Sequence, residues 1–438
     1  MLRLVRVPPW EELTAELARV LGGTDAATVA AVARILAAVR DEGDAALQRF
    51  QREFDRVELM PAEWEIPRRR WDEGLRRLDP AVRGALERAA ARIRAYQEGT
   101  LARVLPRPPG EGPPSGPLAW ERSVPMDRVG VYVPGGQAAY PSTVLMNVIP
   151  ARVAGVREII AVTPPAGVTD AVLGAFAVAG VDRVFQLGGA QAIAALAFGT
   201  ATIPRVDKIV GPGNRWVAEA KRQVSGAVGI DMIAGPTEVL VIADDSADPR
   251  LIAADLLAQA EHDEDACCWL VTPVDALVEA VDRELAALLA RAPRAHIAGP
   301  SLALHGVAVV VPDLTTAIEV ANRRAPEHLE LLVRQPETWL SQVTHAGAVF
   351  LGANTPEPVG DYIAGPSHVL PTGGAARFAS PLGVQDFLKR MSVMQYTREQ
   401  LELDARDIIA LAEAEGLSGH AEAIRVRLGE AGSGKREE

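Results

Sequence analysis

The spacing of apolar residues changes along the chain and separates helical segments from strands. From about Thr24 to Glu98, Ala, Leu, Val and Ile recur three and four positions apart among Arg and Glu, which is typical of amphipathic helices. Further along, short β-rich runs alternate with apolar helical segments. A first series is VGVYV (129–133), EIIAV (158–162), RVFQL (183–187) and DKIV (207–210). A second series is EVLVIA (238–243), CCWLV (267–271), VAVVV (307–311), LELLV (329–333) and AVFL (348–351). This alternation predicts two α/β units with parallel strands and crossover helices.

Three further segments differ in composition from these units. Residues Leu105–Pro117 contain nine Pro or Gly in thirteen positions, which cannot sustain a helix or a central strand and therefore predict a domain boundary. After Pro381 a mostly helical tail runs to about Leu428 and is too short to build a core of its own, so we expect it to pack on something else. The last residues, 431–438, are expected to be disordered.

Charge and composition indicate which classes of binding partner to expect. The 45 Lys and Arg against 57 Asp and Glu give a net charge of -12, and the basic residues are scattered, so no nucleic-acid partner is expected. The long uncharged stretches 129–151 and 184–204 are interrupted by Gly-Gly, polar residues and Pro, so no membrane segment is expected. No export signal is expected at the N-terminus, and the adjacent Cys267 and Cys268 cannot form a disulfide framework. We therefore expect a cytoplasmic protein that binds small molecules.

Three strand-to-helix turns in the first α/β unit are rich in glycine. They are PGG (134–136), GGAQ (188–191) and GPGN (211–214), and none is a GxGxxG motif. Such glycines can simply close tight turns, or they can let the backbone approach a phosphate at a helix N-terminus. Because ligands of open α/β sheets bind at the carboxyl ends of the strands, three such turns favour a nucleotide site. Tyr132, Gln191 and Asn214 are the polar side chains available there.

Histidines in polar surroundings suggest a metal site. Gln259 and His262 lie three positions apart at the end of a helix expected to begin near Asp248, so both face the same side. Asp361 lies in a Gly- and Pro-rich stretch that predicts a defined loop, and His420 is expected in the first turn of a helix that Ser418 can cap. Two His, one Asp and one Gln form a plausible zinc sphere. Solvated surface histidines are the alternative, since no compact spacing joins these residues.

A Glu-His pair is the candidate for acid–base chemistry. Glu327 and His328 are adjacent at the start of the LELLV strand, directly after Pro326, and are expected to face different directions. One can then act on water while the other takes a proton from a hydroxyl, as oxidation of an alcohol to an acid requires. A polar pair on the surface is the alternative. Cys267 and Cys268 lie in an apolar strand without a positive neighbour, so a thiol route is not expected.

With these segments in order, the chain resembles the histidinol dehydrogenase family over nearly its whole length. The stretches that carry the resemblance are RVGVYVPGG, GGAQAIAALAFGT, KIVGPGN, DMIAGPTEVLVIAD, AQAEHD, APEHLEL, GDYIAGPSHVLPT and EGLSGHA. The resemblance implies oxidation of L-histidinol through the aldehyde to L-histidine, the last steps of histidine biosynthesis, with Zn²⁺ (one per subunit) and NAD. It also implies two Rossmann-like, aldehyde-dehydrogenase-like parallel-sheet domains plus helical N-terminal and C-terminal segments.

The resemblance assigns roles to residues by position. The implied zinc ligands are Gln259, His262, Asp361 and His420. The implied catalytic proton-transfer residues are Glu327 and His328. The implied substrate contacts are Thr237, Gln259, His262, His328, Asp361, Glu415 and His420. The implied dinucleotide contacts are Tyr132, Gln191 and Asn214. The resemblance further implies a homodimer with shared active sites, in which Glu415 and His420 of the tail complete the site of the partner.

Three positions depart from the residues usual in the family. Thr237 replaces the usual Ser and keeps the hydroxyl, so the substrate contact should survive. Ser367 replaces a common Asn and can alter hydrogen bonding in its loop. Trp216 replaces a Tyr or Phe. None of the implied ligands or bases is lost.

The expected domain organisation combines the pattern with the resemblance. Residues 1–25 form an N-terminal helical segment. Residues 26–105 and 238–382 form the first α/β domain, with the metal and catalytic residues, and residues 118–237 form the second α/β domain, which binds the nucleotide. Residues 383–430 form a helical tail that reaches the partner subunit, and residues 431–438 are disordered.

Two other functions are compatible with part of this interpretation. A related zinc- and NAD-dependent dehydrogenase could oxidise another polar alcohol, such as a sulfonate diol. A zinc hydrolase, from a different class, would use Glu327 to activate water and would bind no nucleotide.

Overall fold

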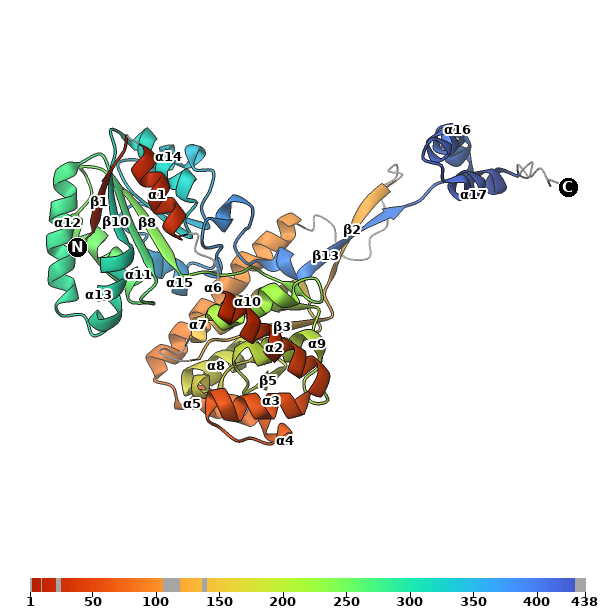
Figure 1. The fold of residues 1–438 in the computed structure, drawn as a ribbon, viewed down its shortest axis with the longest axis horizontal. Coiled ribbons are helices and arrows are strands. Elements are labelled where there is room, and N and C mark those ends of the chain that lie inside the picture. The colour runs from red at the N-terminus through yellow and green to blue at the C-terminus, as the bar shows by residue number, and fades with distance from the viewer. Residues whose placement is uncertain (1, 9, 21–24, 105–118, 136–139, 430–438) are drawn as a thin grey trace. The chain divides into compact units, whose positions relative to one another are not determined.

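The computed structural model describes residues 2–8, 10–20, 25–104, 119–135 and 140–429. The chain divides into two compact units. The first comprises residues 1–106 and 125–388, and the second comprises residues 107–124 and 389–438. The stretch Leu105–Pro117 and the C-terminal residues 431–438, for which a boundary and disorder were predicted, lie outside the described residues. Both α/β units expected from the sequence belong to the first compact unit (Figure 1).

The first series of predicted strands forms a parallel sheet of five strands in the order β5-β4-β3-β6-β7. Its strands are β3 (Arg128–Tyr132), β4 (Glu158–Val162), β5 (Arg183–Phe185), β6 (Lys208–Val210) and β7 (Gly229–Ile230). The chain runs from β3 outward to β5 and returns to β6, so the strand order reverses between β3 and β6. This is the order of a Rossmann-like sheet, and it confirms the predicted α/β class.

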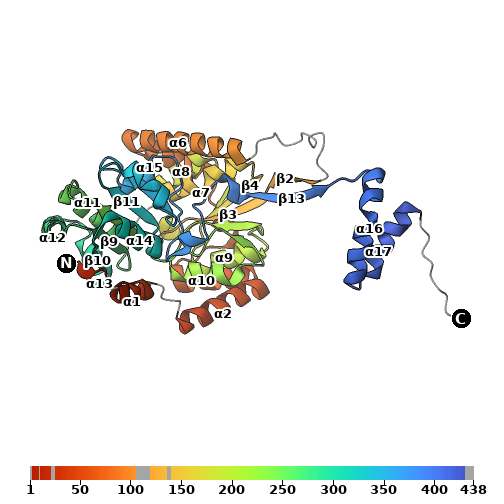
Figure 2. The same ribbon diagram turned by 90° about the horizontal axis from the view of Figure 1, so that it is seen from above.

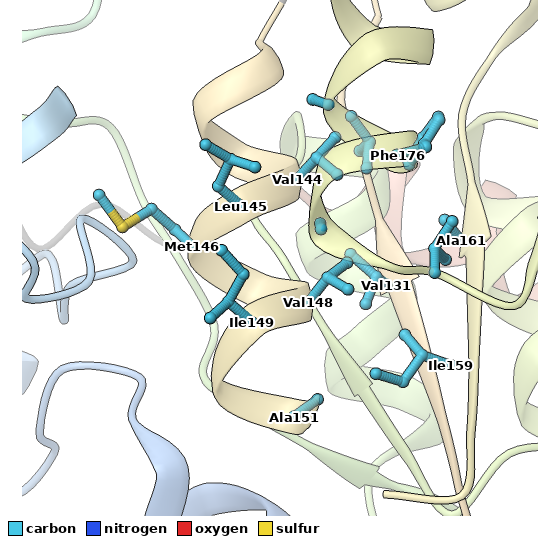
Figure 3. Packing of buried hydrophobic residues seen from close by; sticks show 14 of the residues in the cluster. Val131, Val144, Leu145, Met146, Val148, Ile149, Ala151, Ile159, Ala161 and Phe176 are labelled. Atoms are coloured by element: carbon cyan, nitrogen blue, oxygen red, sulfur yellow. The ribbon is translucent and has the colours of Figure 1, made fainter. Parts of the chain in front are cut away.

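Helices cover both faces of this sheet (Figure 2). One face is covered by α5 (Arg68–Arg77), α6 (Pro80–Val104), α7 (Pro141–Ala154) and α8 (Asp170–Ala179). The other is covered by α2 (Ala26–Glu42), α3 (Asp44–Phe50), α9 (Gly189–Phe198) and α10 (Arg215–Val224). Strand residues alternate between the two cores, and Figure 3 shows Val144 and Val148 of α7 facing Val131 and Ile159 of the sheet. Burial of these apolar side chains is the main force that holds the layers together.

The helices between residues 26 and 104 correct one expectation about the domains. In the structure α2 contacts α9 and α10, α5 contacts α8, and α6 contacts α7, so all of them pack on the five-stranded sheet. The sequence-based grouping placed residues 26–105 with residues 238–382 instead. An amphipathic pattern shows which face of a helix is buried, but it does not show which sheet buries that face.

The second series of predicted strands forms a parallel sheet of six strands in the order β1-β10-β9-β8-β11-β12. Its strands are β1 (Arg3–Arg6), β8 (Glu238–Ala243), β9 (Cys267–Thr272), β10 (Gly306–Val310), β11 (His328–Leu332) and β12 (Ala348–Leu351). One face is covered by α11 (Pro249–Ala260), α12 (Asp275–Leu289) and α13 (Ala295–His305). The other is covered by α1 (Trp10–Val20) and α14 (Leu314–Arg324). Residues 1–25, expected to be helical, therefore also contribute an edge strand, which pairs with the distant β10.

The second compact unit contains a two-stranded sheet and a helix pair. The strands are β2 (Ala119–Pro125) and β13 (Leu388–Met394), and the helices are α16 (Arg398–Ala414) and α17 (Ser418–Leu428), which pack on each other. This corrects the expected helical tail of residues 383–430 in two ways. Residues Val384–Phe387 are part of the core of the first unit, and the following segment is a strand. The two helices agree with the prediction.

Two exclusions made from the sequence can be compared with the structure. The described parts of stretches 129–151 and 184–204 form buried strands and helices of the five-stranded sheet. Among the described residues, no helix combines the length and the apolar character needed to cross a bilayer. Cys267 and Cys268 are both free and buried, and they join the cores on opposite faces of the six-stranded sheet.

Candidate active site

The Glu327–His328 pair lies at the amino ends of two neighbouring strands, β8 and β11. Helix α14 ends at Arg324, and Ala325 follows in a left-handed conformation with φ of 50°, which turns the chain towards β11. His328 is the first residue of β11 and pairs in register with Val239 of β8. The pair is therefore at a strand entrance, as predicted, and not on the exposed surface.

Glu327 is held by two donors. The Thr237 hydroxyl donates to Oε2 of Glu327 at 2.7 Å, and the backbone N–H of Glu238 donates to the same oxygen at 2.9 Å. Burial raises the pKa of Glu327 well above its usual value, and the hydrogen bond from Thr237 opposes this shift. A raised pKa makes the ionised form of this carboxyl group a stronger base towards a bound water.

His328 is held by the same segment of β8. Its Nδ1 lies 3.0 Å from the backbone carbonyl oxygen of Glu238, so Nδ1 carries the hydrogen and Nε2 has the free lone pair. Nε2 is buried and has no hydrogen-bond partner in the part of the chain that is described. Burial lowers the pKa of His328 to about 4, so the ring is neutral at pH 7. A neutral imidazole with a free Nε2 can accept a proton.

The relative direction of the two side chains differs from the expectation. They were expected to face apart, yet Nδ1 of His328 lies 3.7 Å from Oε2 of Glu327. Strand alternation applies only within the strand, and Glu327 precedes β11. Both side chains therefore reach the backbone of Glu238.

A candidate metal centre lies next to this pair. His262, Glu357 and Asp361 offer ligand atoms that all lie within 4.8 Å of one another. Gln259, near the end of α11, joins them: its amide nitrogen donates to the Thr237 hydroxyl at 2.8 Å. This leaves the amide oxygen of Gln259 facing the Glu357 carboxylate. Imidazole nitrogen with carboxylate and amide oxygens fits Zn²⁺, so these residues are suited to the implied metal.

Glu357 is a site residue that the sequence reasoning missed. It begins the short helix α15 (Glu357–Tyr362), whereas the segment around Asp361 was expected to be a loop. In a helix, residues four apart lie on one face, so Glu357 and Asp361 come together. Burial raises the pKa of Glu357 well above its usual value, and the negative charge of Asp361 adds to this shift.

Two more acidic groups lie behind Glu357. The Oε1 atom of Glu330, in β11, accepts a hydrogen bond from the backbone N–H of Glu357 at 2.9 Å. Burial raises the pKa of Glu330 to about 9, and the neighbouring Asp255 adds to the shift. Burial also raises the pKa of Asp255 to about 6. At pH 7 Glu330 therefore keeps its proton, so the neighbouring acids are not all charged at once.

The two sheets approach each other at this site. Nε2 of His368 lies 3.5 Å from the hydroxyl of Thr143, near the start of α7, and Nδ1 of His368 lies 3.1 Å from the backbone oxygen of Asp361. The backbone N–H of Gly235 also donates to the Thr372 hydroxyl at 2.6 Å. Helix α7 begins beyond the carboxyl end of β3, so the carboxyl edge of the five-stranded sheet faces the metal centre.

The remaining predicted site residues lie in the second unit. His420 is in the first turn of α17, as expected, but Leu417 rather than Ser418 occupies the N-cap position. Glu415 is the C-cap residue of α16, and Gly416 follows with φ of 73°. Because these residues belong to a separate compact unit, a contact of Glu415 or His420 with the metal centre stays a prediction.

The three residues predicted to bind the dinucleotide lie at the carboxyl edge of the five-stranded sheet. Tyr132 is buried, and its hydroxyl accepts a hydrogen bond from the backbone N–H of Gly189 at 3.1 Å. Gln191 is buried in the first turn of α9. Asn214 caps α10, because its Oδ1 accepts from the backbone N–H groups of Trp216 and Val217, which leaves its amide N–H₂ available to a ligand.

The GPGN turn (211–214) is rigidly built. Gly211 has φ of 108°, and a Cβ there would lie 2.2 Å from the backbone oxygen of Tyr132, so only glycine fits. Lys221 donates to the backbone oxygen of Gly211 at 3.0 Å, and Asp231 accepts from the Gly211 N–H at 2.7 Å. Lys221 and Asp231 are themselves a fully buried ion pair. The turn is thus held from both sides. Residue 136, in the PGG turn, lies outside the described residues.

The structure accounts for the inert cysteines and gives hydrogen bonds to two of the three residues that depart from the family pattern. Burial raises the pKa of Cys267 to about 11 and raises that of Cys268 well above its usual value, so neither thiol is activated. The Thr237 hydroxyl donates to Glu327, and its contact with the substrate stays a prediction. Ser367 accepts a hydrogen bond from the backbone N–H of Val369 at 3.1 Å. The structure gives no reason for Trp216 in place of a Tyr or Phe.

Fold and site together define a class. Two Rossmann-like sheets, a His-Glu-Asp-Gln cluster suited to a metal, and a buried Glu–His pair suited to acid–base chemistry are features typical of an α/β enzyme.

Comparison with known proteins gives the family. The family model described as histidinol dehydrogenase matches residues 22–428. A histidinol dehydrogenase of Aquifex aeolicus is 53% identical over 397 residues, which cover 90% of this chain and 91% of that protein. One of Pseudomonas aeruginosa is 51% identical, over 90% and 89% of the two chains. The crystal structure of histidinol dehydrogenase from Elizabethkingia anophelis superposes with a TM-score of 0.88 at 32% identity and covers 98% of each chain. The chain belongs to the histidinol dehydrogenase family.

Proposed function

We propose that this chain oxidises L-histidinol through the aldehyde to L-histidine, with NAD as hydride acceptor and Zn²⁺ in the metal centre. The observation that carries the proposal is the placement of Glu327 and His328 beside the cluster of His262, Glu357 and Asp361 in a member of this family. The zinc would be held by Gln259, His262 and Asp361, with His420 of the partner subunit. When bound, zinc orients the amino alcohol and acts as a Lewis acid. NAD, when bound, accepts one hydride in each oxidation.

The protein's own groups account for the proton transfers. Nε2 of His328 accepts the proton of the substrate hydroxyl as the carbinol carbon loses a hydride, which gives the aldehyde. Glu327 takes a proton from water as the water oxygen adds to the aldehyde carbon. The resulting hydrate anion, which retains one hydroxyl proton, loses a second hydride to NAD and that hydroxyl proton to solvent, which gives the carboxylate. The Glu238 backbone keeps both groups aligned through both oxidations, and Thr237 contacts the substrate along with Glu415 of the partner subunit.

We propose a homodimer in which the second unit of each chain completes the site of the other. In support, α16 and α17 leave large apolar side chains uncovered within the second unit: Leu403 is 77% exposed, Leu411 67% and Val426 63%. Such a surface is typical of an interface. The nucleotide-binding role of residues 118–237 and action in the cytoplasm belong to the same proposal, and the buried free cysteines suit a reducing compartment.

Mixing two inactive variants tests the shared site. His262→Ala and His420→Ala homodimers should both be inactive. After exchange of subunits in equal amounts, half of the dimers are mixed and each mixed dimer has one intact site, so about a quarter of wild-type activity should return. Absence of recovery in verified mixed dimers would show that each chain builds its own site.

Growth and metal removal test the function itself. The chain should restore growth without histidine to an auxotroph that lacks histidinol dehydrogenase, and a chelator should abolish activity until Zn²⁺ is restored. Failure of rescue by a well-expressed protein would favour the dehydrogenase of another polar alcohol, such as a sulfonate diol. Hydrolysis without any dinucleotide would favour the zinc hydrolase. Family membership makes both rivals less favoured.

A further inference from the structure

An unusual turn lies beside the nucleotide edge of the five-stranded sheet. After α3, residues Gln51–Asp55 form a π-helical turn that ends at Arg56, a non-glycine residue with φ of 58°. π-helical turns and left-handed non-glycine residues are concentrated at functional sites. The turn itself is held firmly, because Nε2 of Gln51 donates to the backbone oxygen of Gln186 at 2.9 Å and Trp64 donates to Oε1 of Gln51 at 2.9 Å.

This anchor fixes where Asp55 lies. Gln186 directly follows β5 and lies two residues before the GGAQ turn (188–191), so the π-helical turn is attached to the carboxyl end of β5. The carboxylate of Asp55 acts electrostatically on Tyr132, whose hydroxyl accepts from the N–H of Gly189. Asp55 is therefore beside a glycine turn and a residue predicted to bind the dinucleotide.

Asp55 has no structural role that the described contacts account for. Its Oδ2 is buried, and neither carboxylate oxygen accepts a hydrogen bond from a described residue. Burial raises the pKa of Asp55 to about 6, which leaves it mostly ionised at pH 7. Asp25, at the start of α2, differs from Asp55 in this respect, because it accepts from the backbone N–H and the hydroxyl of Thr28. A buried, unsatisfied acceptor that is ionised is costly unless a ligand supplies donors.

We propose that Asp55 binds the ribose hydroxyls of the dinucleotide and thereby selects NAD over NADP. The inference rests on the proposed dinucleotide site at this edge. A carboxylate accepts hydrogen bonds from both hydroxyls of a ribose, and it repels a 2′-phosphate in the same place. Acidic residues perform this role at the carboxyl edge of Rossmann-like sheets, but here the group comes from a helical turn that precedes the sheet in sequence.

Substitution of Asp55 in the zinc-loaded full-length dimer tests the proposal. Asp55→Ala removes the acceptor, Asp55→Asn removes only the charge, and Glu53→Gln on the exposed side of the same turn is the control. The dissociation constants of NADH and NADPH are measured by fluorescence, with KM for NAD and for histidinol and with the melting temperature. We expect Asp55→Ala to weaken NADH binding about tenfold. Asp55→Asn should reduce the preference for NADH over NADPH about tenfold.

Other quantities separate recognition from a structural role. The melting temperature should not fall in either variant, since the unsatisfied charge is removed, and KM for histidinol should stay as in the wild type. Unchanged NADH and NADPH affinities in both Asp55 variants would overturn the inference, as would a loss of stability with equal losses for all ligands. If the wild-type protein itself binds no dinucleotide, the proposed function fails as well, and the two failures are thereby distinguished.

Discussion

The backbone carbonyl oxygen of Glu238 lies 3.0 Å from Nδ1 of His328. This contact places the ring hydrogen on Nδ1 and leaves Nε2, buried and without a described partner, as the nitrogen that can take a proton. The N–H of the same residue holds Glu327. One peptide segment at the entrance of β8 thus orients both members of the acid–base pair.

Replacement of His328 should separate the two oxidation steps. His328→Gln removes the base for the alcohol step, so turnover of histidinol should fall by about 100-fold or more, while oxidation of added aldehyde keeps most of its rate. Glu327→Gln should impair the aldehyde step instead. Steady-state rates with histidinol and with histidinal check this, with exposed His296→Gln as the control. Equal losses in both steps for both variants would contradict the division of roles.

His328 should also make folding sensitive to acid. Burial gives its ring a pKa of about 4 in the folded protein, against 6.5 for an unperturbed histidine, so the unfolded chain takes up the proton first as the pH falls. The contribution of neutral His328 to stability is fully present above pH 6.5. The free energy of unfolding should therefore decrease by about 3 kcal/mol as the pH falls towards 4. Urea unfolding of the metal-free protein at pH 7 and pH 4.5 measures this loss. His328→Gln should lose less stability than the wild type between pH 7 and pH 4.5. If the variant loses as much as the wild type, groups other than His328 cause the loss.

Glu330 should have the opposite pH dependence. Its pKa of about 9 in the folded protein lies above the usual 4.5, so the unfolded chain loses the proton first as the pH rises. The metal-free protein should therefore lose stability between pH 4.5 and 9. Glu330→Gln keeps an oxygen for the Glu357 N–H and should be more stable than the wild type by a few kcal/mol at pH 8, with little difference at pH 4.5. If Glu330→Gln were less stable than the wild type at pH 8, the side chain of Glu330 would not be protonated in the folded protein.

Removing one charge of the Arg324–Glu238 ion pair should destabilise the protein more than removing both charges. Both side chains are almost fully buried, and burial lowers the pKa of Arg324 to about 10. Arg324→Met leaves a buried carboxylate without its partner and should cost about 3–5 kcal/mol in chemical denaturation. Adding Glu238→Gln removes that charge and keeps an acceptor for the Gly373 N–H, so the double variant should recover part of the loss. A double variant no more stable than Arg324→Met would mean that the lost charge pairing is not the cause.

The nine strands predicted from apolar runs are all present, because a fully buried parallel strand needs a continuous run of β-branched or aliphatic residues. The edge strand Arg3–Arg6 was missed, since its sequence RLVR is too short to show a strand pattern and pairs only because β10 offers it an edge. The burial of Glu330 was also not predicted. A glutamate inside LELLV reads as an exposed strand position until the structure shows α11 and α15 covering it.

Some site residues could likewise be predicted from the sequence, and others could not. Gln259, His262, Glu327 and His328 were predicted because polar residues cluster at expected helix or strand ends, and Asp361 because it lies in an expected loop. The structure brings these five residues together. Glu357 was missed because a Gly- and Pro-rich segment suggested a loop, which concealed the helical spacing to Asp361. Asp55 had no motif at all, since its position depends on the contact between Gln51 and Gln186.

The stoichiometry of the reaction tests the central claim most directly. L-histidinol in known, limiting amount is incubated with the zinc-loaded protein and excess NAD, and NADH and histidine are quantified at completion. The account predicts two NADH and one histidine for each histidinol, without free aldehyde. One NADH per histidinol with aldehyde accumulating would contradict it, because a single oxidation gives the Glu327-dependent hydration step no part in the reaction.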